Sequence, residues 1–464
     1  MNLANPILNA DSYKLGHYLQ YPPGTRAVSA YITTRGMSSW PEVVFFGLQM
    51  FLKDYLSKPF TKADIDEAEE IARLHGQPFN REGWEHILKE YGGYLPLRIE
   101  ALPEGSVVRR DVPMVQVVNT DPKSAWLTSY IETALLRAVW YPSSVASTAR
   151  RVRQAIQPFL EKSCVEPEKL AITRLTDFGA RGVTSLEQAG IGGAAHLTQF
   201  NQTDTLSGVL YARKYYGAEM AGLSMPASEH TTMTAWGQDR EIEAFSGMID
   251  NFASFGHYSV VSDSYDIYNA VAEIWGKKLQ TKVRAAGGTL VVRPDSGDPI
   301  DTPVQVVAQL AYAFGTHLNA KGYKVLDDNV RVLQSDGLSL QDMTMILGRL
   351  EGMGFSAENI SFGMGTTLLQ KVSRDTYSFT MKGSAVEDAN GKWRDITRRP
   401  ASLRERLPSA GRQAVIQDGR DILGIPLQEL GSRPNLLQPV FENGELLKDW
   451  GFEEIRERIK AAGL

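Results

Sequence analysis

The residues best suited to chemistry in this 464-residue chain follow short apolar runs in its second part. Seven such runs end in acidic, arginine or glycine residues, as in TLVVRPDSGDP and YSVVSDSYD. Carboxylates hold magnesium waters or ribose hydroxyls, arginine offers forked donors to phosphate oxygens, and glycine lets backbone N–H groups approach an anion. The pattern therefore indicates a site for an anionic, metal-chelated, phosphorylated substrate. Its members are Asp177, Arg181, Asp204, His230, Asp263, Asp266, Arg293, Asp295, Asp298, Asp336, Gly363 and Gly365.

Helical patterns separate these runs, so strands and helices alternate along the chain. Such alternation is typical of parallel strands joined by helical crossovers. We expect an α/β barrel, because its chemistry lies on the rim at the carboxyl ends of the strands; an open doubly wound sheet is the alternative. Thr302, before Pro303, is the expected N-cap of one crossover helix, and Ser339 with Asp342 has the spacing of a capping box in another.

The first part of the chain and the tail have a mixed α+β pattern. Residues 95–119 read as three strands separated by turns, and residues 125–142 read as a buried helix that ends at Pro142. In the tail, a hairpin turning at Asn443–Gly444 precedes a terminal helix from about Phe452. The expected domains are an N-terminal α+β domain (1–167), an α/β barrel domain (168–380) and a C-terminal segment (381–464) that packs back on the first domain.

Composition and charge exclude several classes of protein. The net charge is −5 and the pI is about 5.9, so no overall basic field favours nucleic acid or an anionic membrane. Cys164 is the only cysteine, which excludes an intramolecular disulfide and a multi-cysteine metal site. The N-terminal sequence lacks the basic start and long apolar run of a signal peptide, so we expect none, and no apolar stretch approaches the ~20 residues of a membrane helix. We expect a cytoplasmic enzyme with neither nucleic acid nor membrane as a partner.

Single motifs carry little weight. The tripeptide Asp-Phe-Gly within Leu175–Gly182 also occurs in protein kinases, but the glycine-rich loop and the His-Arg-Asp loop of kinases are absent from the sequence. The GMGTT stretch at Gly363–Thr367 stops short of a dinucleotide fingerprint. His230 opens a helix and is either a catalytic or a packing residue. His196 lies in an apolar run read as a strand, and we expect it to be a core histidine.

Taken together, the ordered motifs are specific. They include DSYKLGHYLQYPPGT, TDFGARGVTSLEQAGIGGAAHL, TDTLSGVLYARKYYG, SMPASEHTTMTAWG, VVSDSYDIYNA, RPDSGDPIDT and VFENGELLKDWGFEEIR. With them the chain resembles the nicotinamide phosphoribosyltransferases of the type II phosphoribosyltransferase family over nearly its whole length. The resemblance implies transfer of a phosphoribosyl group from phosphoribosyl pyrophosphate to nicotinamide, with Mg²⁺, in NAD salvage. It also implies a homodimer with shared active sites and ATP as an activating co-substrate, while the metal ligands stay unknown.

The resemblance also assigns roles to residues that bind the base. It implies that Phe178 stacks on the nicotinamide ring, that Tyr13 of the partner subunit covers the other face, and that Arg181 contacts the carboxamide oxygen. Asp204 matches the residue that favours an amide over an acid, which disfavours the alternative of a nicotinate phosphoribosyltransferase.

Further residues are implied to serve the phosphates, the ribose or the dimer. His230 matches a histidine that some members phosphorylate with ATP. A non-catalytic protein with this fold would show an eroded rim, whereas these rim residues are all in place. The remaining implied positions are Asp263, Arg293, Asp295 and Asp336 for ribose and phosphate, Arg374 and Lys382 for phosphate, Asp11 and Arg35 for the neighbouring site, and Ser224 and Gly365 as further substrate-binding residues.

The sequence departs from the family pattern at a few positions. Ser335 stands where better-known members have glycine, and Thr366–Thr367 replaces a Gly-Gly pair. Thr380 stands in place of serine and keeps a hydroxyl group. The lysine-rich loop of the pattern is here a shorter, arginine-rich loop at Asp395–Pro408. Ser335 and Thr366–Thr367 lie on the expected phosphate loops and bear on loop shape, whereas the arginine-rich loop bears on ATP coupling.

Overall fold

The computed structural model describes residues 5–35, 41–335, 337–397, 410–419 and 421–463. Backbone contacts divide the chain into two compact units. Unit 1 comprises residues 1–147, 214–218 and 372–463, and unit 2 comprises residues 148–213 and 219–371. The domain limits expected at residues 167 and 380 stay a prediction. Along the sequence, the long divisions between the two units fall after Ser147, within a helix, and after Lys371.

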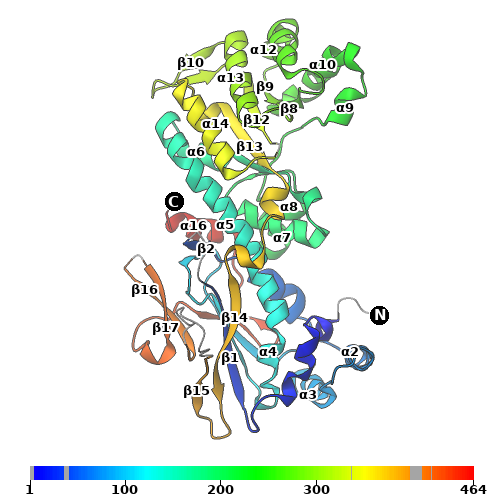
Figure 1. Cartoon of the computed structure of the whole chain (residues 1–464), viewed down its shortest axis with the longest axis vertical. Helices are drawn as coiled ribbons and strands as arrows, with labels where there is room; N and C mark the ends of the chain where they lie inside the picture. Colours follow the sequence, from blue (N-terminus) through cyan, green and yellow to red (C-terminus); the bar gives the residue numbers. More distant parts are fainter. Residues whose placement is uncertain (1–4, 36–40, 336, 398–409, 420, 464) are drawn as a thin grey trace. The chain divides into compact units, whose positions relative to one another are not determined.

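Unit 1 contains a seven-stranded antiparallel sheet with the order β15-β14-β1-β5-β3-β18-β19. Strand β1, inside this sheet, is buried along its whole length and pairs with β14 on one side and β5 on the other. Figure 1 shows β1 in blue beside β14 in orange, so the two ends of the chain share one sheet. The strands are β1 (Ala27–Thr34), β3 (Leu97–Ala101), β5 (Val115–Asn119), β14 (Phe379–Glu387), β15 (Trp393–Asp395), β18 (Gln438–Glu442) and β19 (Glu445–Leu446).

Helices and two smaller strand pairs complete unit 1. An aromatic cluster of Phe60, Trp84, Trp126 and Tyr130 lies in its apolar core. The predicted hairpin at Asn443–Gly444 is confirmed, and both turn residues have positive φ. The other elements are β2 (Glu42–Val44), β4 (Val107–Arg109), β16 (Gln413–Asp418), β17 (Asp421–Pro426), α1 (Leu48–Phe51), α2 (Lys62–Leu74), α3 (Arg81–Tyr91), α4 (Leu127–Tyr130) and α16 (Phe452–Ala461).

The helix expected to end at Pro142 does not end there. Helix α5 runs from Glu132 to Ser163, through the proline. Pro142 packs against Gly47, whose φ is +102°, and a Cβ on that glycine would lie 2.3 Å from the proline ring. This tertiary contact, together with the buried face of the helix, offsets the hydrogen bond that proline cannot donate.

Unit 2 is a ring of parallel strands, as the alternating pattern predicted. Six strands form a parallel sheet with the order β7-β6-β13-β12-β9-β8. The remaining predicted run, AGLSMPASEH, contains a segment, Leu223–Ser228, that bridges both edge strands in parallel: Leu223 pairs with Gln202 and Ala227 with Ser259. Backbone hydrogen bonding therefore continues around the ring. The strands are β6 (Leu175–Asp177), β7 (Gln202–Thr203), β8 (His257–Val261), β9 (Thr289–Arg293), β12 (Val330–Gln334) and β13 (Ile360–Met364).

Crossover helices follow these strands, and Figure 1 shows α13 and α14 beside β12 and β13. The capping box of Ser339 and Asp342 is confirmed at the start of α14. Thr302 is not an N-cap; α13 begins at Asp301, because the Asp298 carboxylate accepts the N–H groups of Ile300 and Asp301. The helices are α6 (Pro167–Ala171), α7 (Leu186–Leu197), α8 (Leu206–Tyr216), α9 (His230–Thr234), α10 (Glu241–Phe252), α11 (Ile267–Asn269), α12 (Gln280–Ala285), α13 (Asp301–Phe314), α14 (Leu340–Gly352) and α15 (Thr366–Leu369).

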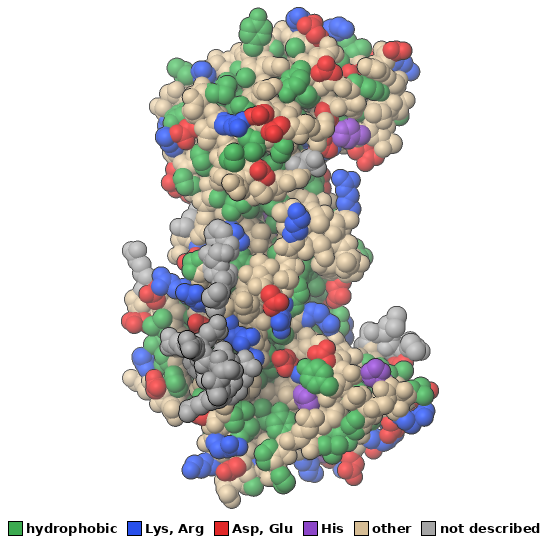
Figure 2. Space-filling model, viewed as in Figure 1, with side chains coloured by type: hydrophobic (Ala, Val, Ile, Leu, Met, Phe, Trp, Pro, Cys, Tyr) green, Lys and Arg blue, Asp and Glu red, His purple; other side chains and the backbone are tan. Residues whose placement is uncertain are grey.

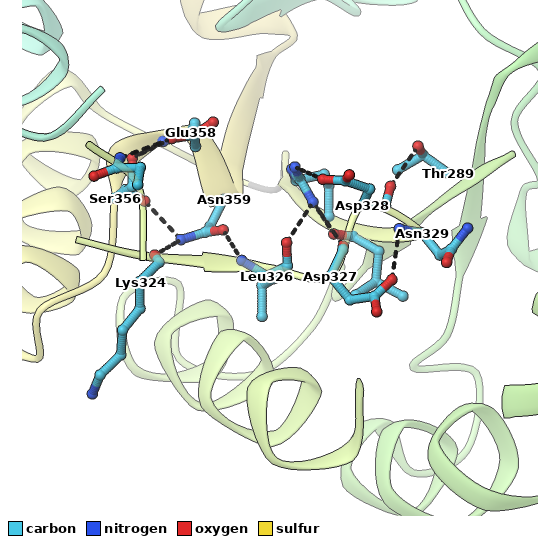
Figure 3. Close-up of polar contacts among 12 residues, drawn as sticks. Thr289, Lys324, Leu326, Asp327, Asp328, Asn329, Ser356, Glu358 and Asn359 are labelled. Carbon is cyan, nitrogen blue, oxygen red and sulfur yellow. Dashed lines mark hydrogen bonds and ion pairs between the residues drawn. The ribbon is translucent and has the colours of Figure 1, made fainter. Parts of the chain in front are cut away.

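A polar network lies at the amino-terminal end of the barrel strands (Figure 3). The Asn359 side chain donates to the carbonyl oxygens of Lys324 and Ser356, at 2.8 and 2.9 Å, and accepts the N–H of Leu326 at 2.8 Å. Arg331 donates to the carbonyl of Asp327 at 2.9 Å. These bonds satisfy backbone groups where the strands begin, which is the stability end of such a barrel.

The surface carries charges of both signs. Figure 2 shows lysine and arginine side chains interspersed with aspartate and glutamate on the face that it draws. Among the described residues, no helix is both long and apolar enough to cross a membrane.

Candidate active site

The barrel brings most of the predicted site residues of unit 2 to its carboxyl-terminal rim. Parallel pairing aligns the strand ends, so side chains that are distant in sequence become neighbours. Hydrogen bonds join residues after four of the ring segments into one connected group around Asp263 and Asp295. The segments and their rim residues are Leu223–Ser228 with His230, β8 with Asp263, β9 with Arg293 and Asp295, and β12 with Ser335.

His230 lies between two carboxylates at the centre of this group. Its Nε2 atom is 3.0 Å from Asp263 Oδ1, and its Nδ1 atom is 4.0 Å from Asp295 Oδ2. The Asp263 side chain is 2% exposed, whereas that of His230 is 46% exposed. The second oxygen of Asp263 accepts the backbone N–H of Asp295 at 3.1 Å. The imidazole is therefore held through Nε2, and its Nδ1 edge is open to a reactant.

Arg293 adds a cation beside these acids. Its Nη2 atom lies 3.6 Å from Asp295 Oδ2, and its Nε–H is buried. Among the described residues, this Nε–H has no hydrogen-bond partner. A buried donor without a partner is costly, and a phosphate oxygen would satisfy it. The Arg293 guanidinium is thus placed to bind an anionic substrate.

The loop that carries Asp263 has a support that the sequence did not indicate. The indole N–H of Trp275 donates to the Ser262 hydroxyl at 3.1 Å, and that hydroxyl donates to the Val260 carbonyl at 2.9 Å. Trp275 is buried in the π-helix Ala270–Lys278 and stacks on Phe245. No spacing rule links a tryptophan in a crossover helix to a serine just after the strand, thirteen residues earlier.

Phe178 lies where strands β6 and β13 end. Its N–H donates to the carbonyl of Met364 at 2.9 Å. A Cβ on Gly363 would be 2.3 Å from the Phe178 ring, so this glycine lets the ring lie against the strand. The ring is partly exposed and can stack on a flat aromatic ligand. Arg181 follows in the short 3₁₀ helix Ala180–Gly182, with its side chain exposed.

Asp177, although it ends strand β6 at the rim, is a structural carboxylate. It is fully buried, and Oδ1 accepts the N–H of Gly179 at 2.7 Å. Burial raises its pKa, and the nearby His196 opposes this shift. His196 is a core histidine, as predicted, but it lies in helix α7 rather than in a strand. The apolar run was misread because α7 is buried on most sides and has no polar stripe.

Asp204 follows strand β7 and presents an exposed carboxylate on the rim. The Ser224 hydroxyl donates to its Oδ1 atom, and this bond fixes the orientation of the carboxylate. Partial burial raises the pKa of Asp204; the Ser224 bond and the charge of Arg293 oppose this shift. Asp204 and Ser224, predicted separately as substrate-binding residues, are thus brought together from positions twenty residues apart.

Other predicted rim residues have different roles or lie outside the described residues. Asp266 accepts the N–H groups of Tyr268 and Asn269 and caps α11, as Asp298 caps α13. Gly365 precedes α15. Asp336 and the arginine-rich residues 398–408 lie outside the described residues.

Five of the predicted site residues belong to unit 1. The Asp11 carboxylate accepts the Thr133 hydroxyl at 2.7 Å, and Tyr13 is 58% exposed. The N–H of Arg35 donates to the Ser378 carbonyl at 3.1 Å. Arg374 donates to Asp375 at 3.0 Å, and Lys382 lies in β14.

The carboxylate oxygens on the rim suit a hard cation that also has ligands from outside the protein. Asp263 and Asp295 offer carboxylate oxygens, which Mg²⁺ prefers. Within the described part of the chain, no group of three or more acidic, histidine or cysteine residues forms a metal cage. The donor set therefore fits a magnesium ion that is bound mainly by phosphate oxygens and water.

Comparisons with known proteins agree with this arrangement. Residues 173–426 match the model of the nicotinate phosphoribosyltransferase (NAPRTase) family, and residues 5–99 match that of the nicotinamide phosphoribosyltransferase N-terminal domain. A nicotinamide phosphoribosyltransferase from Xanthomonas campestris pv. campestris is 45% identical over 469 residues, covering 100% of this chain and 99% of the relative. Another from Acinetobacter baylyi is 33% identical over 493 residues, covering 98% and 97%.

Solved structures share the fold. A nicotinate-nucleotide pyrophosphorylase from Pyrococcus furiosus superposes with a TM-score of 0.64 at 18% identity, covering 100% of this chain and 98% of the other.

Proposed function

The chain belongs to the nicotinate phosphoribosyltransferase family, and from this premise we propose that it transfers the phosphoribosyl group of phosphoribosyl pyrophosphate to nicotinamide. The products are nicotinamide mononucleotide and pyrophosphate, and the reaction is a pentosyl transfer in NAD salvage. The observation that carries the choice of substrate is the Asp204 carboxylate, which Ser224 orients on the same rim as Phe178.

The reaction needs positioning more than proton transfer. The pyridine nitrogen donates its lone pair to C1 of the ribose, and the electron pair of the C1–O bond leaves with pyrophosphate. No proton is moved, so no general base is required. As that bond breaks, the pyridine ring becomes cationic and negative charge collects on pyrophosphate. Arg293, with its buried donor, is suited to stabilise the leaving group.

The base would be selected by stacking and by charge. The Phe178 ring offers a flat apolar face, and Arg181 would donate to the carboxamide oxygen. The amide NH₂ would donate to Asp204, whereas the carboxylate of nicotinate would be repelled by it. Nicotinate is therefore the disfavoured competitor.

We also propose magnesium and ATP as co-reactants. Asp263 and Asp295 would be the nearby oxygen donors for a magnesium ion, which would supply positive charge to the leaving group. The ATP proposal rests on His230: with Nε2 held by Asp263, the Nδ1 lone pair can attack the γ-phosphorus of ATP while ADP departs with the bonding electron pair. Hydrolysis of that phosphohistidine would couple ATP to synthesis of the mononucleotide.

A homodimer is proposed as the working form, with Asp11, Tyr13 and Arg35 serving the site of the neighbouring copy. The exposure of Tyr13 supports this, because an aromatic ring at the surface is available to a partner. Leu206 and Leu210, one helical turn apart on α8, are also exposed apolar residues. Arg374 and Lys382 stay predicted phosphate contacts. A cytoplasmic location would fit this role, and the single cysteine supports it.

The test is competition between the two bases. The protein is incubated with phosphoribosyl pyrophosphate, Mg²⁺ and nicotinamide or nicotinate, with and without ATP, and pyrophosphate release is followed. We expect release with nicotinamide and stimulation by ATP. Faster turnover of nicotinate would contradict the amide assignment, and no release with either base would contradict the transferase assignment.

A further inference from the structure

The hydroxyl of Ser335 contacts the acidic group of the rim directly. Ser335 follows strand β12, and its Oγ donates to Asp295 Oδ1 at 2.9 Å. On its other side, Ser335 lies against Gly363: a Cβ on that glycine would be 2.8 Å from Ser335 Cβ. The same hypothetical Cβ would meet the Phe178 ring. Ser335 therefore contacts the Asp295 carboxylate on one side and, on the other, the glycine that also borders the Phe178 ring.

The two oxygens of the Asp295 carboxylate have different surroundings. Oδ1 accepts the Ser335 hydroxyl, while Oδ2 lies 3.6 Å from Arg293 Nη2 and 4.0 Å from His230 Nδ1. Neither of these longer separations is a hydrogen bond. Among the described residues, Ser335 is thus the only hydrogen-bond donor to this carboxylate. The terminal torsion of aspartate is broad, so one strong donor decides where the second oxygen points.

We propose that Ser335 is a positioning residue for phosphoribosyl pyrophosphate. Its hydroxyl holds Asp295 so that Oδ2 faces Arg293 and His230, where the ribose and its pyrophosphate would bind. This inference rests on the proposed function. A glycine at this position, as in the family pattern, has no hydroxyl and leaves the carboxylate to be oriented by other means. The orientation of Asp295 by a hydroxyl is then a property of this chain.

The test separates the two substrates. Ser335→Ala removes the hydroxyl and keeps the Cβ that lies beside Gly363. We expect the KM for phosphoribosyl pyrophosphate to rise about tenfold, the effect of losing one hydrogen bond to a charged group. The KM for nicotinamide should stay within about twofold, because the surroundings of the Phe178 ring are unchanged. A general loosening of the site would instead raise both constants and lower the thermal midpoint.

A matched control and a double variant sharpen the result. Ser361→Ala removes a half-buried hydroxyl from the neighbouring strand β13, away from the rim, and should change neither constant. In an Asp295→Ala background, Ser335→Ala should cause no further loss, because its partner is gone. Calorimetric titration with phosphoribosyl pyrophosphate gives the same comparison without turnover. A full additional loss in the double variant would overturn the proposal.

The proposed function and this inference can fail separately. If the wild-type protein releases pyrophosphate with nicotinamide but Ser335→Ala matches it in both constants, the positioning role is refuted and the function stands. If the wild-type protein neither turns over nor binds phosphoribosyl pyrophosphate in the calorimeter, the proposed function is refuted, and the positioning role with it.

Discussion

Replacing Asp204 with asparagine removes one negative charge from the rim and keeps nearly the same shape. The asparagine carbonyl can still accept the hydroxyl of Ser224, so the side chain should keep its orientation. The amide of nicotinamide would lose a charged acceptor, while the carboxylate of nicotinate would no longer meet a like charge. We therefore expect Asp204→Asn to lower the preference for the amide.

The size of this effect follows from the exposure of Asp204. Two like charges about 4 Å apart repel by about 1 kcal/mol in water and by about 4 kcal/mol at the effective dielectric constant of a protein surface. Because Asp204 is exposed, we take about 1–3 kcal/mol. The ratio of kcat/KM for nicotinamide to that for nicotinate should then fall by about 5-fold to 150-fold. Asp204→Ser should weaken the preference as well.

The pH dependence gives a second measure of the same charge. Burial raises the pKa of Asp204, so its carboxylate takes up a proton at a higher pH than an ordinary aspartate does. As the pH falls from neutral toward the ordinary range of aspartate, the wild-type preference for the amide should decline. In Asp204→Asn, which has no such proton to bind, the ratio should stay flat over the same range.

Both measurements use initial rates of pyrophosphate release with each base. The control is Ser207→Ala, a half-buried serine on α8 that should leave the ratio unchanged. An unchanged ratio in Asp204→Asn, with normal turnover of nicotinamide, would refute the electrostatic reasoning and remove Asp204 from selectivity.

Three further variants test the site and its scaffold. Gly363→Ala places a methyl group 2.3 Å from the Phe178 ring, so the KM for nicotinamide should rise about tenfold or more in steady-state kinetics. Tyr216→Phe removes the hydroxyl that donates to the buried carboxylate of Glu104 at 2.8 Å, so urea unfolding should show a loss of about 1.5–3 kcal/mol. Asn359→Ala leaves the buried N–H of Leu326 without its acceptor and removes one of the two donors to the carbonyls of Lys324 and Ser356, so the free energy of unfolding should fall by about 1–3 kcal/mol while both KM values persist.

Each of these variants has a matched control in the chain. Gly348→Ala adds a methyl group in α14 that would lie 3.9 Å from its nearest neighbour, and Tyr312→Phe changes a tyrosine that is 95% exposed. Both should behave as wild type. A KM for nicotinamide unchanged by Gly363→Ala would show that the ring does not stack on the base. An unfolding curve unchanged by the loss of the Tyr216 hydroxyl or the Asn359 amide would show that those bonds contribute nothing.

The barrel could be predicted because its signal is repeated along the chain. Each of the seven runs contributes a segment to the ring, with Leu223–Ser228 as a bridging segment. In AAHLTQFNQTD, however, only Gln202–Thr203 form a strand, and the apolar part of that run lies in helix α7. Helix ends with capping side chains, such as Ser339, were also predictable, since a cap is a local feature. The end of α5 was not, because Pro142 is accommodated by a contact with Gly47, ninety-five residues away.

The individual site residues were predictable, but their pairing was not. Strand ends place Asp263, Asp295 and His230 on one rim, yet which nitrogen of His230 meets which carboxylate depends on packing. The role of Ser335 was missed for the same reason. In the sequence it appears as a change in a loop, and only the parallel register of β9 and β12 brings its hydroxyl to Asp295.

The segment Leu223–Ser228 also bears on how the protein loses activity. Four backbone hydrogen bonds hold it between β7 and β8, and Pro226 has no N–H to add another. Segments with few such bonds open locally at a lower cost than the rest of a domain. Opening here would carry Ser224 away from Asp204 and release the start of α9 at His230 while the other six strands stayed paired. Mild heat or denaturant should therefore abolish turnover before the circular dichroism of the barrel changes.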